Sequence, residues 1–188
     1  AWLLPGLAGH DPWKSEEAIT FSLAHHILAT GDWVVPIAAG EPYVATPPLY
    51  AMAAALSAKL FGALLPAHDG ARLATGLFVG LTIYWLALTA NRLFGPRFGR
   101  LSALLFMGSL GLLLRAHEMS PDVAVLATTT LGLYALTRLR EHPRLGAILF
   151  GTALGSSFMA GGVAPALILM LALISVCALA PACRPVHD

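Results

Sequence analysis

Charged side chains are scarce in this sequence. Asp, Glu, Lys and Arg make up 11% of its 188 residues, whereas typical soluble domains contain about 25%. None of them occurs between Leu145 and Cys183, and Gly161-Gly162 divides this uncharged stretch into two halves of roughly membrane-spanning length. Soluble domains rarely carry such a run, so the sequence predicts an integral membrane protein.

Other features are missing as well. The net charge is only +1 and no short basic patch with interleaved aromatic residues is present, which argues against a nucleic-acid partner. Cys177 and Cys183 have no partner spacing for zinc and imply no disulfide framework. The chain opens inside an apolar run, without Met or a basic flank. We therefore expect residues 1–9 to be the end of a first transmembrane helix.

Apolar runs separated by helix breakers predict the rest of the membrane region. We expect five transmembrane helices within residues 73–183: at about 73–90, 98–114 and 123–137, and two more in the uncharged stretch. These runs lack the two-residue alternation of a β-barrel, so helices are the structure that satisfies their backbone in lipid. Residues 184–188 would then be a cytoplasmic loop or a truncated end.

Arginines gather in the loops on one side of the predicted spans. Residues 91–100 and 138–144 hold three arginines each, whereas Lys14, Lys59, Arg72 and Arg115 fall on the other side. By the positive-inside bias, the arginine-rich side is cytoplasmic. We therefore expect a multi-pass protein of the bacterial inner membrane, surrounded by membrane lipids, with the segment 10–72 in the periplasm.

The segment 10–72 has helical patterns of its own. Within residues 15–29, Ile19, Leu23 and Ile27 form one stripe, which predicts an amphipathic helix along the membrane surface. After an extended connection, Pro47-Pro48 opens a second helix that ends near Gly62. The predicted fold class is all-α: a polytopic transmembrane helical bundle with surface-lying amphipathic helices in its first periplasmic loop.

Two adjacent carboxylates, Glu16 and Glu17, are the first candidates for chemistry. Either is suited to act as a general base that activates an acceptor hydroxyl or amine. Acids in the first turn of a helix also stabilise it by roughly 0.3–1 kcal/mol and need no further role. Asp11 has the same two interpretations, as a site residue or as a turn former.

A second group of polar residues lies at the outer end of a predicted span. Arg115, His117 and Asp122 face the same side of the membrane as Glu16. Ionisable residues at such depth are functional candidates by default. The alternative is an ion cluster in the layer of lipid headgroups, and the sequence favours neither interpretation.

A series of short motifs is more specific. The motifs are Ala-Thr-Gly-Asp-Trp-Val-Val-Pro at 29–36, Gly-Glu-Pro-Tyr at 40–43, Pro-Pro-Leu-Tyr at 47–50, Leu-Phe-Gly at 60–62 and Ala-Arg-Leu at 71–73. In order and spacing they resemble the first outer loop of integral-membrane glycosyltransferases of the GT-C class. The branch they resemble is that of bacterial aminoarabinose transferases and protein O-mannosyltransferase-like proteins. The resemblance covers essentially the whole chain and corresponds to the N-terminal portion of such proteins.

The resemblance implies an activity and roles for several residues. The activity is transfer of a sugar from a polyprenyl-phosphate-linked donor to a lipid or protein acceptor at the periplasmic face. Glu16 occupies the position of the catalytic base, with Glu17 as its acidic neighbour. Arg72 matches an arginine that serves the donor phosphate or the fold, and Arg115 is a second candidate for that phosphate. The residues expected to shape the site are Asp11, His117 and Asp122.

The chain departs from the family pattern in two places. The family commonly has Glu-Lys before the two prolines, where this chain has Ala45-Thr46, and it often has a lysine after Phe158 that is missing here. One charge near a partly desolvated phosphate is worth ~1.5–3 kcal/mol. Two classes therefore stay open: an enzyme that uses other cations, or a catalytically lapsed membrane subunit that binds a partner in a larger complex. The sequence identifies no metal ligands, and a divalent metal stays open as a cofactor.

Overall fold

Helices form most of the chain in the computed structural model, which describes residues 14–38 and 40–179. They are α1 (Ser15–Thr30), α2 (Leu49–Phe61), α3 (Ala67–Phe94), α4 (Phe98–Met107), α5 (Leu110–Arg115), α6 (Asp122–Arg138), α7 (Pro143–Gly161) and α8 (Val163–Leu179). The expectation of a mainly helical fold is confirmed. Asp11, the expected end of a first span at 1–9 and the expected loop at 184–188 lie outside the described residues.

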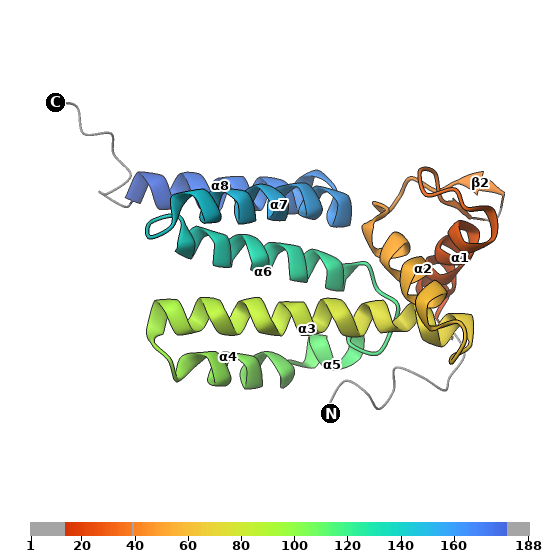
Figure 1. The fold of residues 1–188 in the computed structure, drawn as a ribbon, viewed down its shortest axis with the longest axis horizontal. Coiled ribbons are helices and arrows are strands. Elements are labelled where there is room, and N and C mark those ends of the chain that lie inside the picture. Colours follow the sequence, from red (N-terminus) through yellow and green to blue (C-terminus); the bar gives the residue numbers. More distant parts are fainter. Residues whose placement is uncertain (1–13, 39, 180–188) are drawn as a thin grey trace.

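The helices form a long bundle with a smaller layer at one end (Figure 1). In the bundle, α6 lies between α3 and α7, α8 packs against α7, and α4 packs against α3. The end layer holds α1 and α2, of which α2 contacts α3. Helix α6 matches the range expected for it, and α7 and α8 divide the uncharged stretch as expected, but α3 begins at Ala67, ahead of the expected start at 73. Arg72 therefore belongs to a helix and not to a loop.

Length and composition single out α3 as a helix that could cross a membrane. It has 28 residues, and it is the one helix in the described ranges that is both long enough and apolar enough. Helices α2, α4 and α8 are apolar but shorter. The helix expected at 98–114 is wrong as a continuous element, because α4 ends at Met107 and α5 starts at Leu110. Ser109 between them has an extended backbone (φ −70°, ψ 132°), which interrupts the helical hydrogen bonds.

The buried face of α1 overlaps the expected stripe only in part. Leu23 and Ile27 are buried as predicted, but Ile19 is 39% exposed. Glu17 and Thr20, which are not part of that stripe, are buried together with Leu23 and Ile27. The connection to α2 contains a two-stranded antiparallel hairpin of β1 (Ile37–Ala38) and β2 (Glu41–Pro42), which the all-α prediction omitted. The second expected helix is confirmed as α2.

Two glycines of α7 differ sharply in the space around them. A methyl group at Gly146 would lie 2.8 Å from both the Cα and the backbone nitrogen of Leu139, at the end of α6. A methyl group at Gly151 would meet nothing within 4 Å. The absence of a side chain at Gly146 is therefore what lets α7 fold back closely on α6.

We expect Gly146→Ala to lower the free energy of unfolding by about 1–3 kcal/mol, because backbone atoms cannot move aside as a flexible side chain does. The matched control is Gly151→Ala, in the same helix. It should be neutral or stabilising by up to about 1 kcal/mol, because alanine favours helix. Thermal unfolding of both variants in detergent measures the difference, and equal effects would contradict the packing described for Gly146.

Candidate functional site

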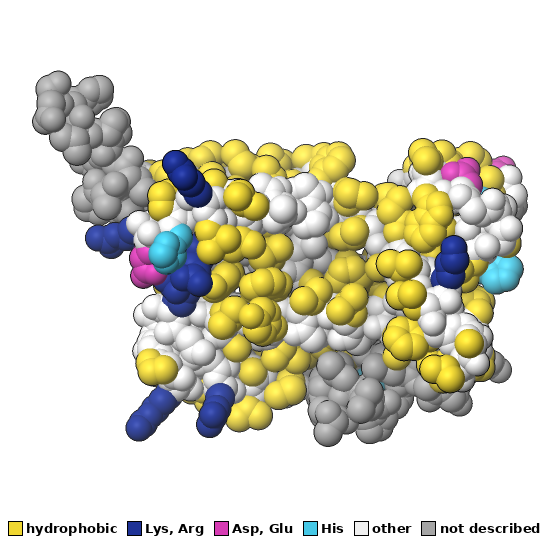
Figure 2. Space-filling view, viewed as in Figure 1, with side chains coloured by type: hydrophobic (Ala, Val, Ile, Leu, Met, Phe, Trp, Pro, Cys, Tyr) yellow, Lys and Arg dark blue, Asp and Glu magenta, His cyan; other side chains and the backbone are white. Residues whose placement is uncertain are grey.

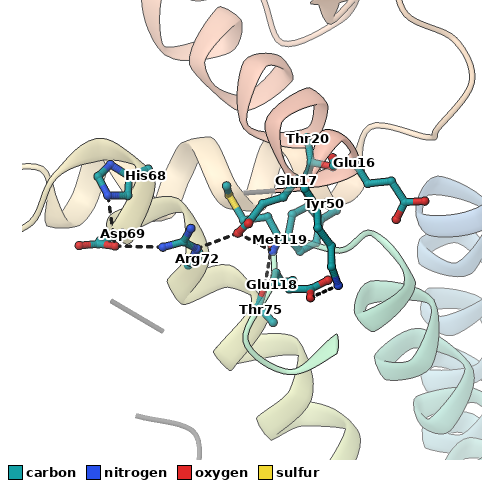
Figure 3. Close-up of polar contacts among 11 residues, drawn as sticks. Glu16, Glu17, Thr20, Tyr50, His68, Asp69, Arg72, Thr75, Glu118 and Met119 are labelled. Atoms are coloured by element: carbon teal, nitrogen blue, oxygen red, sulfur yellow. Dashed lines mark hydrogen bonds and ion pairs between the residues drawn. The ribbon is translucent and has the colours of Figure 1, made fainter. Parts of the chain in front are cut away.

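A carboxylate and a guanidinium meet out of contact with water where α1 crosses α3. The side chains of Glu17 and Arg72 are 1% and 0% exposed, and Arg72 Nε donates a hydrogen bond of 2.8 Å to Glu17 Oε1. On its other side, Arg72 Nη1 donates to Asp69 Oδ1 at 3.3 Å, and His68 Nε2 lies 3.5 Å from the same oxygen. Figure 3 shows this chain of contacts. We call Glu17, Asp69 and Arg72 the buried ion network.

The network also holds the segment that joins α5 to α6. The backbone N–H of Met119 donates to Glu17 Oε1 at 3.3 Å. Thr75 Oγ1, from α3, donates to the carbonyl oxygen of Glu118 at 2.8 Å, and the Tyr50 hydroxyl lies 2.6 Å from Thr75 Oγ1. Lys14 forms an ion pair with the Glu118 carboxylate. Helices α1, α2 and α3 thus fix the position of residues 118–119.

Tyr50 is 1% exposed. Burial raises the pKa of its phenol far above the usual value, and the nearby Glu17 charge acts in the same direction, whereas the hydrogen bond to Thr75 lowers it. Tyr50 therefore stays a neutral hydrogen-bonding group at any physiological pH. Its place in the structure is that of a fixed support and not of a proton acceptor.

A pocket of about 250 Å³ opens next to this network. Helix α1, the chain before α2, and the segment from α5 into α6 all contribute to its wall. The lining residues are Glu16, Ile19, Thr20, Tyr43, Thr46, Arg115, Met119, Ser120, Pro121 and Asp122.

Glu16, Arg115 and Asp122 bring opposite charges together in the pocket. Arg115 Nη1 lies 3.2 Å from Glu16 Oε2 and 3.7 Å from Asp122 Oδ2, and it donates to Ser120 Oγ at 3.4 Å. The side chains of Glu16 and Arg115 are 76% and 43% exposed, so solvent or a ligand can reach both. In Figure 3, the Glu16 carboxylate points away from the buried ion network. An accessible carboxylate beside a guanidinium is able to accept a proton close to a bound anion.

The structure thus divides the residues singled out from the sequence into two groups. Glu16, Arg115 and Asp122 share the pocket, whereas Glu17 and Arg72 are enclosed behind it and do not line it. His117 is half-buried and is absent from the pocket wall. The position of Arg72 gives no support to its expected contact with a phosphate.

Sequence reasoning missed several lining residues, including Tyr43 and Ser120. Tyr43 belongs to the Gly-Glu-Pro-Tyr motif at 40–43, and this motif is the signal in the sequence that points to it. Thr46 also lines the pocket, which means that one departure from the family pattern changes the pocket itself. Within residues 14–38 and 40–179, no three His, Cys, Asp or Glu side chains cluster in a way that could hold a metal ion. A divalent metal therefore has no evident ligand set in this part of the chain.

Comparison with known sequences yields one matching family and named relatives. The model of the family described as dolichyl-phosphate-mannose-protein mannosyltransferase matches residues 45–181. Two relatives from two strains of Pseudomonas fluorescens are both called undecaprenyl phosphate-alpha-4-amino-4-deoxy-L-arabinose arabinosyl transferase 1. They are 32% and 30% identical over 167 and 168 residues, and each alignment covers 86% of this chain. The chain spans 30% and 29% of their lengths.

Comparison with solved structures shows the same fold in a crystallised protein. The crystal structures of ArnT from Cupriavidus metallidurans, in the apo state and bound to undecaprenyl phosphate, superpose with TM-scores of 0.82 and 0.84 at 21% sequence identity. The alignments cover 94% and 95% of this chain and 34% of the ArnT chain. At this identity the comparison establishes the fold of the described helices.

Breaking the buried ion network should be costly. We expect Arg72→Met and Glu17→Leu each to lower the free energy of unfolding by ~3–5 kcal/mol, because each leaves a buried charge without its main counter-charge. The double variant should lose much less than the sum of the two. Arg115→Met is the control, since it opens ion pairs at exposed side chains and should cost about 1 kcal/mol or less. Additive losses in the double variant would contradict the coupling.

Proposed function

The chain belongs to the dolichyl-phosphate-mannose-protein mannosyltransferase family, and on this premise we propose that the protein is a membrane glycosyltransferase. It transfers a sugar from a polyprenyl-phosphate-linked donor to a lipid or protein acceptor. The observation that carries the proposal is the pocket in which the accessible carboxylate of Glu16 lies 3.2 Å from the Arg115 guanidinium. A base and an anion-binding group side by side are what this reaction requires.

The relatives support the class of donor. The matched Pseudomonas proteins are named as transferases of a sugar carried on undecaprenyl phosphate. One of the ArnT crystal structures with this fold contains undecaprenyl phosphate. We therefore assign the polyprenyl phosphate to the Arg115 side of the pocket. A guanidinium offers paired N–H donors that match phosphate oxygens.

In the proposed reaction, an acceptor hydroxyl or amine attacks the anomeric carbon of the donor sugar. The bond from that carbon to the acceptor forms while its bond to the phosphate oxygen breaks, so the stereochemistry inverts. Glu16 takes the acceptor's proton, and the leaving polyprenyl phosphate keeps the bonding electrons. Arg115 stabilises the charge that develops on this phosphate.

The remaining residues hold Glu16 and Arg115 in position. Asp122 and Ser120 hold the Arg115 guanidinium at 3.7 and 3.4 Å. The burial of Arg72 supports the second role that the resemblance allows, which is to stabilise the fold. In this assignment Glu17 and Arg72 are positioning residues that act through residues 118–119, and the donor phosphate contacts Arg115.

We also propose how the chain sits in the bacterial inner membrane. Helices α3 to α8 would form the multi-pass bundle expected within residues 73–183, with the first turns of α3 preceding that range. Helices α1 and α2 would lie in the periplasmic segment 10–72. The bundle surface carries many exposed apolar side chains, among them Leu104, Leu105, Ile168 and Leu171, each at least 60% exposed. Such a surface fits a lipid surrounding. The pocket would then open at the periplasmic face.

Glu16→Gln tests the base directly. We expect transfer of labelled sugar from an undecaprenyl-phosphate-linked donor to fall by roughly 10²–10⁴-fold, because the amide cannot accept the proton. The thermal stability should be unchanged, since the carboxylate is exposed. Glu41→Gln, in the exposed strand β2 and outside the pocket, is the matched control and should keep full activity. Undiminished turnover in Glu16→Gln would rule out this base.

Donor binding can be tested from both directions. Arg115→Met should weaken binding of the purified full-length protein to undecaprenyl phosphate about tenfold or more, because a charge-assisted contact is lost. Thr46→Lys restores the lysine that the family pattern has at this place in the pocket wall, and it should strengthen binding. Titration with both variants measures the two effects. If neither changes the affinity, the phosphate does not bind in this pocket.

A further inference from the structure

A second cluster of charge lies at the opposite end of the bundle from the pocket. Figure 2 shows lysine or arginine side chains gathered at the end where α3 turns into α4 and α6 turns into α7. The two stretches that form this end, 91–100 and 138–146, contain six arginines and a single acid, Glu141. We call this the arginine end.

The arginine end contains a cavity of about 450 Å³ at the turn between α6 and α7. Its wall consists of the last turn of α6, the turn itself and the first turn of α7. The lining residues are Arg138, Glu141, His142, Pro143, Arg144 and Leu145. Since α7 starts at Pro143 with no acid in its first turn, that end of the helix adds to the positive potential.

The charges around the cavity do not cancel. Glu141 forms an ion pair with Arg92 from the end of α3, so its negative charge is already matched. In the described ranges, Arg138 and Arg144 form no ion pair, and the cavity is left with an excess of positive charge. A cavity of this kind attracts an anion.

Arg138 is held in place in advance of any ligand. Its Nε donates to the Tyr134 hydroxyl at 2.9 Å, and the guanidinium carbon lies 5.6 Å from the centre of the Tyr134 ring. The indole of Trp85 stacks on the same Tyr134 ring, with centroids 5.3 Å apart. A guanidinium fixed in this way loses little entropy when it binds an anion.

The cavity continues into an apolar surface. Leu145 lines it and is 44% exposed, and Ile148, one turn further along α7, is 65% exposed. At the neighbouring end of α3, Leu93 and Phe94 are 60% and 67% exposed. A small soluble phosphate would make no contact with these apolar side chains, whereas the acyl chains of a lipid would cover them.

We propose that this cavity binds the headgroup of an anionic membrane phospholipid. The phosphate contacts Arg138 and Arg144, and the acyl chains run along Leu145 and Ile148 on α7. This site is separate from the pocket of Glu16 and Arg115, and it does not depend on the proposed transfer reaction. Basic pockets between helices at the cytoplasmic side of membrane proteins bind anionic lipid headgroups.

The test uses the full-length protein, purified in detergent and stripped of lipid. Binding of phosphatidylglycerol is measured by native mass spectrometry, with zwitterionic phosphatidylcholine as the competitor without net charge and inorganic phosphate as the soluble competitor. The variant is Arg144→Gln, alone and combined with Arg138→Gln. The matched control is Arg97→Gln with Arg100→Gln, which removes two exposed charges from the same end outside the cavity wall. Thermal unfolding without lipid checks that each variant is folded.

We expect phosphatidylglycerol affinity to fall about tenfold or more in Arg144→Gln and to stay within about twofold of the wild type in the Arg97/Arg100 control. Phosphatidylcholine should bind weakly to all of them. Equal losses in the variant and the control would overturn the proposal, because they would indicate a diffuse field and not a site. Displacement of the lipid by millimolar inorganic phosphate would overturn it too, since the apolar contacts would then contribute nothing. If the double variant with Arg138→Gln fails to fold, the phosphatidylglycerol affinity of Arg144→Gln alone decides between these outcomes.

Discussion

The ion pair between Glu17 and Arg72 is the interaction on which the site depends. Both side chains are withdrawn from water, and each would cost several kcal/mol to bury without the other. Glu17 Oε1 accepts from Arg72 and from the Met119 backbone. A single oxygen atom therefore ties α1, α3 and the segment before α6 together. Any rearrangement of these three elements would leave a charge buried without its partner.

The pocket is a consequence of this arrangement. Consecutive residues of a helix point about 100° apart, so burying Glu17 turns Glu16 outward. Fixing Met119 places Arg115 on one side of the anchored segment and Asp122 on the other, and Arg115 forms ion pairs with both Asp122 and Glu16. The buried ion network is thus a rigid support for the exposed, charged side chains that line the pocket. Such a division suits a site that must bind an anionic substrate without reorganising its own charges.

Periodicity and helix breakers predicted the bundle helices and α2, because apolar runs and Gly or Pro boundaries are local signals. The burial of Glu17 could not be predicted in this way. Its partner Arg72 is 55 positions away, and acids in the first turn of a helix are commonly surface residues that stabilise the helix end. The break between α4 and α5 was also missed, because Gly108-Ser109 is short and lies within an apolar run. The arginine-rich loops were visible from the sequence, but the cavity between α6 and α7 was not. It depends on how closely Gly146 lets the two helices approach.

The most direct test of this account is hydrogen–deuterium exchange of residues 116–121 in the full-length protein, compared between the wild type and Arg72→Met. If the buried ion network holds this segment, its amides, including that of Met119, should exchange much faster in the variant. Those in the middle of α6 should exchange as in the wild type. Unchanged protection of residues 116–121 would contradict the account, because it would mean that the segment keeps its position without the ion pair.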